Sequence, residues 1–267
     1  MNFINRSLAN RLFVSFTIIG FLPFIIFLMY NVLLSETKLV DKLILDQDRK
    51  ARQVSKLINA HIESLEKEVM FLSKLDLMDD LLAEDIDKRV SRLLKQRKDD
   101  YSLDLEFHVL SSDYEILSSS NKTMIAKQFM FKSKLQATQG QFYIDKKLYI
   151  YTKIFASFEN TKDIGFFILE YNLENLKFYL EHSVNEYAYM QRDDQHIGVE
   201  KSFDLKIINE KGVEILKEHI VVYQKMESLL EGWYIFYVVK KSIALEFFYE
   251  FIRFMLYLSP LLILLTL

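Results

Sequence analysis

An apolar run near the N-terminus constrains this chain more than any other feature. No charged side chain occurs from Leu12 to Leu34, and roughly 20 apolar residues are enough to cross the ~30 Å hydrocarbon layer of a membrane. Pro23 does not oppose this assignment, because spanning helices tolerate proline. Arg6 and Arg11 precede the run, with no acidic residue. The sequence therefore predicts a cytoplasmic tail over residues 1–11 and a first transmembrane helix over residues 12–34.

A cleaved signal peptide is the alternative for this N-terminal run. Its apolar core would be shorter and would end at small residues in an A-x-A pattern. Here the run ends Asn31-Val32-Leu33-Leu34-Ser35-Glu36, without that pattern. We therefore expect an uncleaved anchor.

A second apolar run closes the sequence. Phe254–Leu267 is too short to cross a membrane unless more residues follow. The preceding Ser242–Arg253 mixes acidic and aromatic residues, as at a headgroup interface. A C-terminal helix buried in a soluble core is the alternative, but Leu261–Leu267 has no polar face. We expect a truncated second transmembrane helix over residues 250–267, in the front part of a longer protein.

The region between the two runs is expected to fold outside the membrane. With a cytoplasmic N-terminus, residues about 35–246 become the extracytoplasmic part of a multi-pass inner-membrane protein. The chain has no cysteine, which excludes disulfides and thiolate sites. Its net charge of −3 is well mixed and gives no footprint for nucleic acid. No catalytic motif occurs, and we expect neither a cofactor nor a metal.

The first part of this region, residues 35–100, reads as helix. Glu36–Lys74 contains no proline or glycine. From Val54 onward its apolar residues recur mostly at steps of three and four, which is helical spacing; the full series is Val40, Leu43, Val54, Ile58, Ile62, Leu65, Val69 and Leu72. This long helix either packs along the domain as its spine or pairs with its copy in a homodimer, and both can hold. Asp79–Lys98 predicts a second helix with one apolar face.

Beyond Tyr101 the pattern changes to strands, and we expect one module over residues 101–183. In Leu148–Phe155 both faces carry apolar side chains, so the sheet is expected to be covered on both sides. The expected order is strands Leu103–Leu110 and Tyr114–Ser119, helix and loop Asn121–Gln136, strands Gln141–Ile144, Leu148–Phe155 and Ile164–Tyr171, then helix Leu173–Leu180.

A shorter module is expected over residues 200–243. Phe203–Ile208 and Val213–Leu216 predict a hairpin, Glu218–Leu230 a helix, and Gly232–Val239 a strand. Asp193-Asp194-Gln195-His196 is the only local group of acidic residues with a histidine. A metal site there needs three or four converging ligands, so we expect a solvated loop.

Three segments resemble the Cache family of PAS-like extracytoplasmic sensor domains. Asp163–Leu173 resembles the last strand of a distal module, Ile207–Gly212 the opening hairpin of a second module, and Gly232-Trp233-Tyr234 with Lys240 its closing strand. The resemblance implies an α+β fold. A long N-terminal helix (membrane span plus stalk) would pack on a PAS-like antiparallel sheet, followed by an abbreviated second PAS-like module and a C-terminal membrane helix.

The resemblance also implies a function. Receptors of this family bind small metabolites and transmit a helix shift across the membrane, as homodimers. A sensor histidine kinase is the expected full-length protein, with its catalytic domain outside this chain. A diguanylate cyclase or chemotaxis transducer is the alternative output. A two-span envelope adaptor without a ligand is the alternative of another class.

Four residues are candidates for ligand contact. Glu170 falls where amino-acid-binding members of the family carry an aspartate for the ligand's amine; alternatively it points to solvent at a strand end. Tyr149 and Tyr151 share a strand face with Lys153 and can line a pocket, or simply pack in the core. Lys127–Lys134 has lysines and phenylalanines, but not the arginine-tryptophan-tyrosine pattern that holds the ligand's carboxylate in those members.

Overall fold

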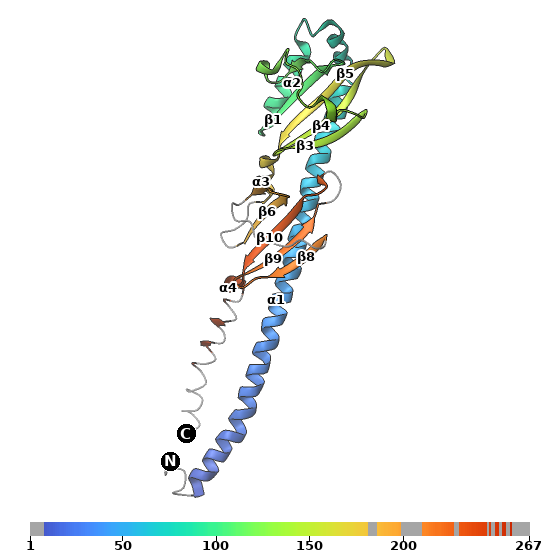
Figure 1. Ribbon diagram of the computed structural model, residues 1–267. Helices are drawn as coiled ribbons and strands as arrows, with labels where there is room; N and C mark the ends of the chain where they lie inside the picture. Colours follow the sequence, from blue (N-terminus) through green and yellow to red (C-terminus); the bar gives the residue numbers. More distant parts are fainter. Residues whose placement is uncertain are drawn as a thin grey trace. The chain divides into compact units, whose positions relative to one another are not determined.

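The computed structural model describes residues 8–180, 186–198, 210–226 and 230–244, with single positions up to 257; over residues 8–36 it describes mainly the backbone. Figure 1 shows the elements in chain order. The chain divides into two compact units, and the larger comprises Ala51–Gly212 with Tyr223–Tyr237. The first of the two five-stranded sheets is antiparallel throughout, the second contains an antiparallel hairpin, and the class is α+β, as predicted.

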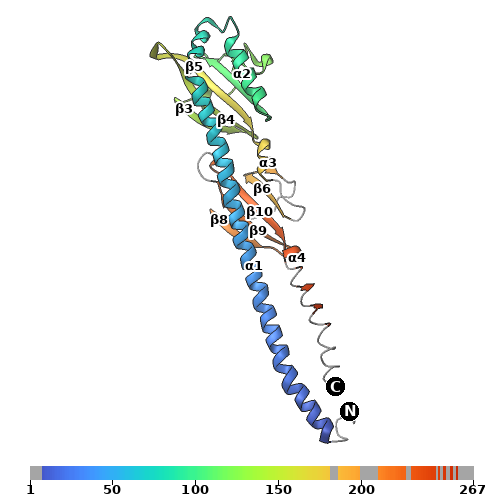
Figure 2. The same cartoon turned by 180° about the vertical axis from the view of Figure 1, so that it is seen from behind.

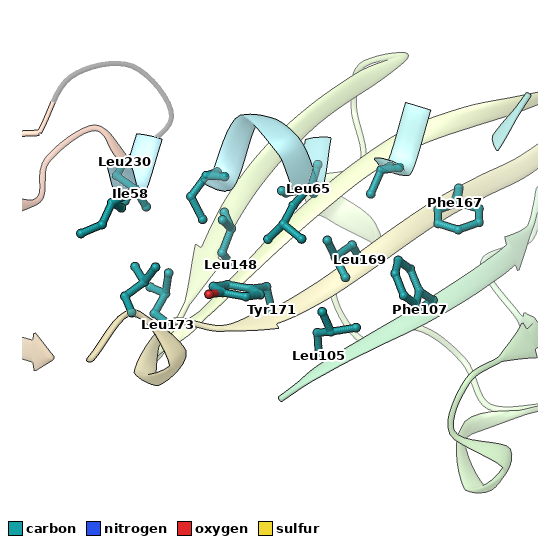
Figure 3. Close-up of a cluster of buried hydrophobic side chains, with 14 of the residues drawn as sticks. Ile58, Leu65, Leu105, Phe107, Leu148, Phe167, Leu169, Tyr171, Leu173 and Leu230 are labelled. Carbon is teal, nitrogen blue, oxygen red and sulfur yellow. The ribbon is translucent and has the colours of Figure 1, made fainter. Parts of the chain in front are cut away.

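The long helix α1 runs from Leu8 to Ser73. Within the larger unit it lies along one face of the first sheet (Figures 1 and 2). The apolar positions predicted from Val54 onward are buried there: Val54, Ile58, Ile62, Leu65, Val69 and Leu72. Val40 and Leu43, earlier in the series, are half-buried. In Figure 3, Leu65 lies over Leu148 and Leu169 of the sheet, and Ile58 lies next to Leu230; all five belong to one buried cluster. The spine interpretation is thus confirmed for this segment, and pairing with a second copy stays a prediction.

The first sheet, which we call the distal sheet, has the strand order β2-β1-β5-β4-β3. Its strands are β1 (Leu105–Ser111), β2 (Ile116–Ser119), β3 (Gln139–Ile144), β4 (Lys147–Ala156) and β5 (Glu159–Asn172). Successive side chains of a strand point to opposite faces. On β5, Phe167, Leu169 and Tyr171 therefore face α1, whereas Phe166, Ile168 and Glu170 face away. Both faces are covered, as Leu148–Phe155 predicted.

The face away from α1, the outer face, is covered by the β2–β3 connection. Only two 3-10 turns, η2 (Lys122–Met124) and η3 (Lys132–Lys134), occur where a helix and loop were expected. Phe129 and Phe131 of this connection pack edge-on against Tyr149, at 6.2 and 5.5 Å between ring centroids. An aromatic cluster thus closes part of the outer face.

The predicted helix Asp79–Lys98 is wrong as one element. The structure has a 3-10 helix, η1 (Asp76–Ala83), and a separate helix, α2 (Arg89–Asp100). Between them Glu84, Asp85 and Lys88 adopt φ of 57°, 48° and 53°, which breaks the helical path. The Asp85 carboxylate then accepts the N–H groups of Val90 and Ser91 and caps the start of α2.

The helix expected after the distal sheet is present in two short pieces. The 3-10 turn η4 (Leu173–Leu176) leads into α3 (Lys177–Leu180). The side chain of Asn172 accepts the N–H of Glu174 and caps η4. This capping fixes where β5 ends.

The second sheet has the order β7-β6-β10-β9-β8. It begins at Glu186, earlier than the expected module start at residue 200. Its strands are β6 (Glu186–Arg192), β7 (Gln195–Gly198), β8 (Lys211–Ile215), β9 (His219–Lys225) and β10 (Tyr234–Lys240), followed by α4 (Lys241–Ala244). The segment expected as a solvated loop, 193–196, supplies the β6–β7 turn and the first residues of β7. The predicted strand Phe203–Ile208 lies outside the described residues.

The helix predicted over Glu218–Leu230 is wrong, because His219–Lys225 forms β9. Ile220, Val221 and Val222 are consecutive, buried and β-branched. Such residues favour a pleated sheet over a helix. Pairing within the sheet thus prevailed over the weak helical spacing of this segment.

The two predicted membrane spans fall mostly on residues whose side chains are not described. The backbone of 12–34 is helical as part of α1, and 250–267 lies outside the described residues apart from single positions. Among the residues that the structure describes, no helix is both long enough and apolar enough to cross a membrane.

Candidate functional site

A cavity of about 720 Å³ opens on the outer face of the distal sheet. One wall is formed by β1, β4 and β5, and the β2–β3 connection forms the other. The side chains that line it are acidic, basic and aromatic: Asp104, Glu106, His108, Asn121, Phe129, Phe131, Asp145, Lys146, Lys147, Tyr149, Glu170 and Glu174, with several apolar and amide residues. Its size suits a small organic molecule.

Strand register brings the central residues together. Glu106 of β1 lies opposite Glu170 of β5, which in turn lies opposite Tyr149 of β4. These three side chains form a row across the outer face. His108 is two residues beyond Glu106 and therefore shares that face. Two carboxylates, an imidazole and a phenol thus meet in the cavity wall.

His108 is the most constrained member of the group, with 1% of its surface exposed. Its Nδ1 atom lies 2.9 Å from Ser119 Oγ, which also accepts the backbone N–H of Asn121. Its Nε2 atom lies 3.7 Å from Glu106 Oε2 and 3.8 Å from Glu170 Oε2. Both distances exceed a hydrogen bond, and Nε2 has no hydrogen-bond partner.

Each of the two carboxylates already has a cationic partner. Glu170 forms an ion pair with Lys147. Glu106 Oε1 accepts Asn121 Nδ2 at 2.9 Å and lies 3.5 Å from Lys98 Nζ. Burial opposes ionisation of Glu170, but the hydrogen bond and positive charge of Lys147 outweigh it and hold its pKa well below the ordinary value. Glu170 is therefore a carboxylate at neutral pH.

Carboxylates at the rim of the cavity also have partners. Glu174 forms ion pairs with Lys146 and Lys177. The Asp104 carboxylate accepts Asn172 Nδ2 at 2.7 Å. Among the described lining residues, both lysines are thus engaged by carboxylates, and the lining contains no arginine.

The structure separates the four candidate residues into two pairs. Glu170 and Tyr149 lie in the cavity wall. Burial raises the pKa of Tyr149, and the negative charge of Glu170 with a hydrogen bond to it raises this pKa further. Tyr151 and Lys153 share the face but do not line the cavity. Lys153 Nζ lies 2.8 Å from Asp163 Oδ2 instead. Ligand contact stays a prediction for Glu170 and Tyr149.

Sequence reasoning missed Glu106, His108 and Lys147. A signal was present for the first two. Within the predicted strand Leu103–Leu110, alternation places Glu106 and His108 on the face opposite Leu105 and Phe107. Two ionisable side chains on one face of a strand whose other face is apolar mark a polar site. No group of three or more possible metal ligands converges within the described residues.

The pairing of Glu170 gives a testable pH dependence. Its folded pKa of about 2 lies below its ordinary value of 4.5. Its stabilising contribution is therefore complete above pH 4.5 and is lost as the pH falls towards 2. We expect wild type to lose on the order of 1–2 kcal/mol more unfolding free energy than Glu170→Gln between pH 6 and pH 3, allowing for solvent at Lys147. Urea unfolding at several pH values measures this.

The control for this prediction is Glu84→Gln, which changes an exposed loop carboxylate. It should follow the wild-type pH profile. An identical acid sensitivity of wild type and Glu170→Gln would contradict the assigned ion pairing.

Comparisons with known proteins identify the fold. No protein-family model and no curated protein matches the sequence. Solved structures do match. The sensory domain of the Campylobacter jejuni chemoreceptor Tlp3 has a TM-score of 0.58 at 12% identity, over 78% of this chain and 98% of that one. The fold is that of an extracellular sensor domain.

Two further sensor domains support this assignment. The sensor domain of the V. cholerae histidine kinase DctB matches with a TM-score of 0.52 at 12% identity, over 75% of this chain and 98% of that one. The ligand-binding domain of the Pseudomonas fluorescens chemoreceptor CtaA, in complex with L-serine, matches with 0.54 at 14% identity, over 76% and 99%. The predicted resemblance to Cache-type sensor domains is confirmed at the level of the fold.

Proposed function

We propose that this chain is the extracytoplasmic small-ligand sensing region of a membrane-bound bacterial receptor. The cavity on the outer face of the distal sheet is its ligand site. The observation that carries the proposal is the buried Nε2 atom of His108, which lacks a partner between two carboxylates in the cavity wall. A buried polar atom without a hydrogen bond costs about 1–3 kcal/mol. Such a cost is commonly retained where a ligand completes the site.

The sheet itself provides a route for the signal. The strands β1, β4 and β5 carry the cavity on one face and pack against Ala51–Ser73 of α1 with the other. A ligand that changes the spacing of these strands therefore changes the surface on which α1 rests. Ligand binding would shift the population between two packings of this helix. In the proposed receptor, α1 continues into the first membrane span at residues 12–34.

The proposed output is a histidine kinase. The sequence resemblance supports this choice, as does the match to the sensor domain of the histidine kinase DctB. The chemoreceptor matches support a chemotaxis transducer as the alternative. A chimera that joins this chain to the catalytic part of a characterised histidine kinase tests the choice. Ligand-dependent autophosphorylation would support it, and no response to a bound ligand would count against it.

A thermal-shift screen of the full 267-residue chain in mild detergent tests ligand sensing itself. The first compounds to test are amino acids and their amine and acid derivatives, because CtaA is seen with L-serine, L-leucine and L-alanine. We expect at least one compound to raise the melting temperature by mass action. Glu170→Gln should abolish that shift and Glu84→Gln should keep it. If no compound of a broad metabolite library raises the melting temperature, the ligand-free envelope adaptor is favoured instead.

A further inference from the structure

We infer that the cavity takes an organic ammonium ion that carries no carboxylate group. The inference rests on the proposed sensing function and names the ligand class of the same site. It is based on three observations: the distribution of charge in the lining, the ion pairs that the lining lysines already form, and the hydrogen-bond acceptors around His108. Each of these points to a cation and against a ligand anion.

The described lining residues carry an excess of negative charge. Leaving His108 aside, five carboxylates and two lysines give the lining a formal charge of −3: Asp104, Glu106, Asp145, Glu170 and Glu174 against Lys146 and Lys147. A cleft lined by one sign of charge concentrates ligands of the opposite sign. Lys98 and Lys177 lie just outside this lining and pair with Glu106 and Glu174, which reduces the excess from −3 to −1 without reversing its sign. The field in the cavity therefore favours a cationic ligand.

A ligand carboxylate would find no free cation among the described residues of this wall. Lys147 is paired with Glu170, and Lys146 with Glu174. A bound carboxylate would have to displace one of these glutamates and leave it unpaired in a half-buried position, which is costly. For a ligand that carries both an amine and a carboxylate, the ammonium therefore contributes favourable binding free energy, and the carboxylate opposes binding.

The group around His108 suits an ammonium. An ammonium has three N–H donors and no acceptor. Glu106 Oε2 and Glu170 Oε2 are acceptors, and Nε2 of the imidazole is a further acceptor in the tautomer whose Nδ1–H donates to Ser119 Oγ. The separations of 3.7 and 3.8 Å allow one donor nitrogen to bridge the imidazole and a carboxylate. The ammonium would thus supply the hydrogen bond that Nε2 lacks.

The aromatic side chains supply the second half of the site. Phe129, Phe131 and Tyr149 line the same cavity, with rings 5.5–6.2 Å apart where they pack on Tyr149. The faces of aromatic rings attract cations and pack against apolar groups. An ammonium joined to an apolar or aromatic body therefore matches both walls.

A matched set of three compounds tests the class of ligand. Phenethylamine, L-phenylalanine and 3-phenylpropionate share one body and differ in which charged groups they carry. The aliphatic set of isoamylamine, L-leucine and 4-methylpentanoate repeats the comparison. Isothermal titration on the full chain in mild detergent should show binding of at least one amine. We expect its parent amino acid to bind at least tenfold more weakly and the acid not to bind.

The opposite order overturns the inference. If an amino acid binds as tightly as its amine, or an acid binds, the site recognises a carboxylate; if neither amine binds, it does not take this class of cation. In these cases a hit elsewhere in the metabolite screen leaves the sensing function standing. Failure of the whole screen removes the sensing function itself, so the two failures are distinguishable.

Substitutions locate the ammonium. Glu106→Gln and Glu170→Gln should each weaken binding of the amine at least tenfold, and Glu84→Gln should leave it unchanged. Lys147→Gln frees Glu170 from its ion pair and should tighten amine binding severalfold. A site built for a carboxylate predicts the reverse, because Lys147→Gln would then remove the ligand's partner. Circular dichroism melts confirm that each variant is folded before titration.

Discussion

Replacing Gly165 with alanine is expected to lower the unfolding free energy by about 3 kcal/mol or more. Gly165 lies in the central strand β5 between Ser111 of β1 and Ile154 of β4. Its φ is +153°, and a Cβ atom added there would lie 1.8 Å from the carbonyl oxygen of Leu110. The clash is with backbone, so relief requires separating β1 from β5. We expect loss of folded protein or a greatly lowered denaturant midpoint.

The matched control for this prediction is Gly140→Ala in the edge strand β3. The three atoms nearest to a Cβ added there belong to the ring and hydroxyl of Tyr151, at 2.8–3.2 Å. A side chain can shift where a backbone carbonyl in the sheet centre cannot, so we expect a clearly smaller loss. Equal costs for the two variants, or a Gly165→Ala protein within about 1 kcal/mol of wild type, would contradict the β1–β5 register.

Phe167→Ala is expected to cost about 3–5 kcal/mol. Phe167 is fully buried, on the face of the distal sheet that packs against α1. Its ring lies edge-on to Phe107 at 6.0 Å (Figure 3). Truncation leaves a cavity in the layer between sheet and helix, and the rigid sheet can close it only in part. Urea unfolding followed by circular dichroism measures the loss.

The exposed Phe158 provides the control for this substitution. It is 66% exposed in the β4–β5 turn, and Phe158→Ala should stay within about 0.5 kcal/mol of wild type. A Phe167→Ala protein as stable as wild type would mean that the layer between α1 and the distal sheet does not stabilise the fold.

The parts of the fold that sequence predicted well are those with a strong local period. The spacing from Val54 to Leu72 gave the buried face of α1, because three- and four-residue steps align on a helix. The alternation in Leu148–Phe155 correctly predicted that both faces of β4 are covered. The prediction failed at Glu84–Lys88, where positive φ values break the helix, and at His219–Lys225, where sheet pairing decides the conformation.

For the candidate site, the sequence predicts which strand face a residue lies on, but not which residues of other strands it contacts. Alternation assigns Glu170, Tyr149 and His108 to a face of their own strands, but not to one another. Their contact depends on the strand order β2-β1-β5-β4-β3 and on its register. Both are set by long-range packing. Lys153 illustrates the limit: it shares the face with Tyr149, yet its distance along β4 gives it Asp163 as a partner.

The most direct test of whether the outer face of the distal sheet is the ligand site is hydrogen exchange. It is measured by mass spectrometry with and without the most stabilising compound. Residues 104–108, 121–131, 144–149 and 170–174 contribute the cavity wall. We expect ligand to slow exchange in these segments, and peptides from Ala51–Ser73 of α1 should also respond. Protection confined to β6–β10, with the cavity segments unchanged, would contradict this assignment of the site.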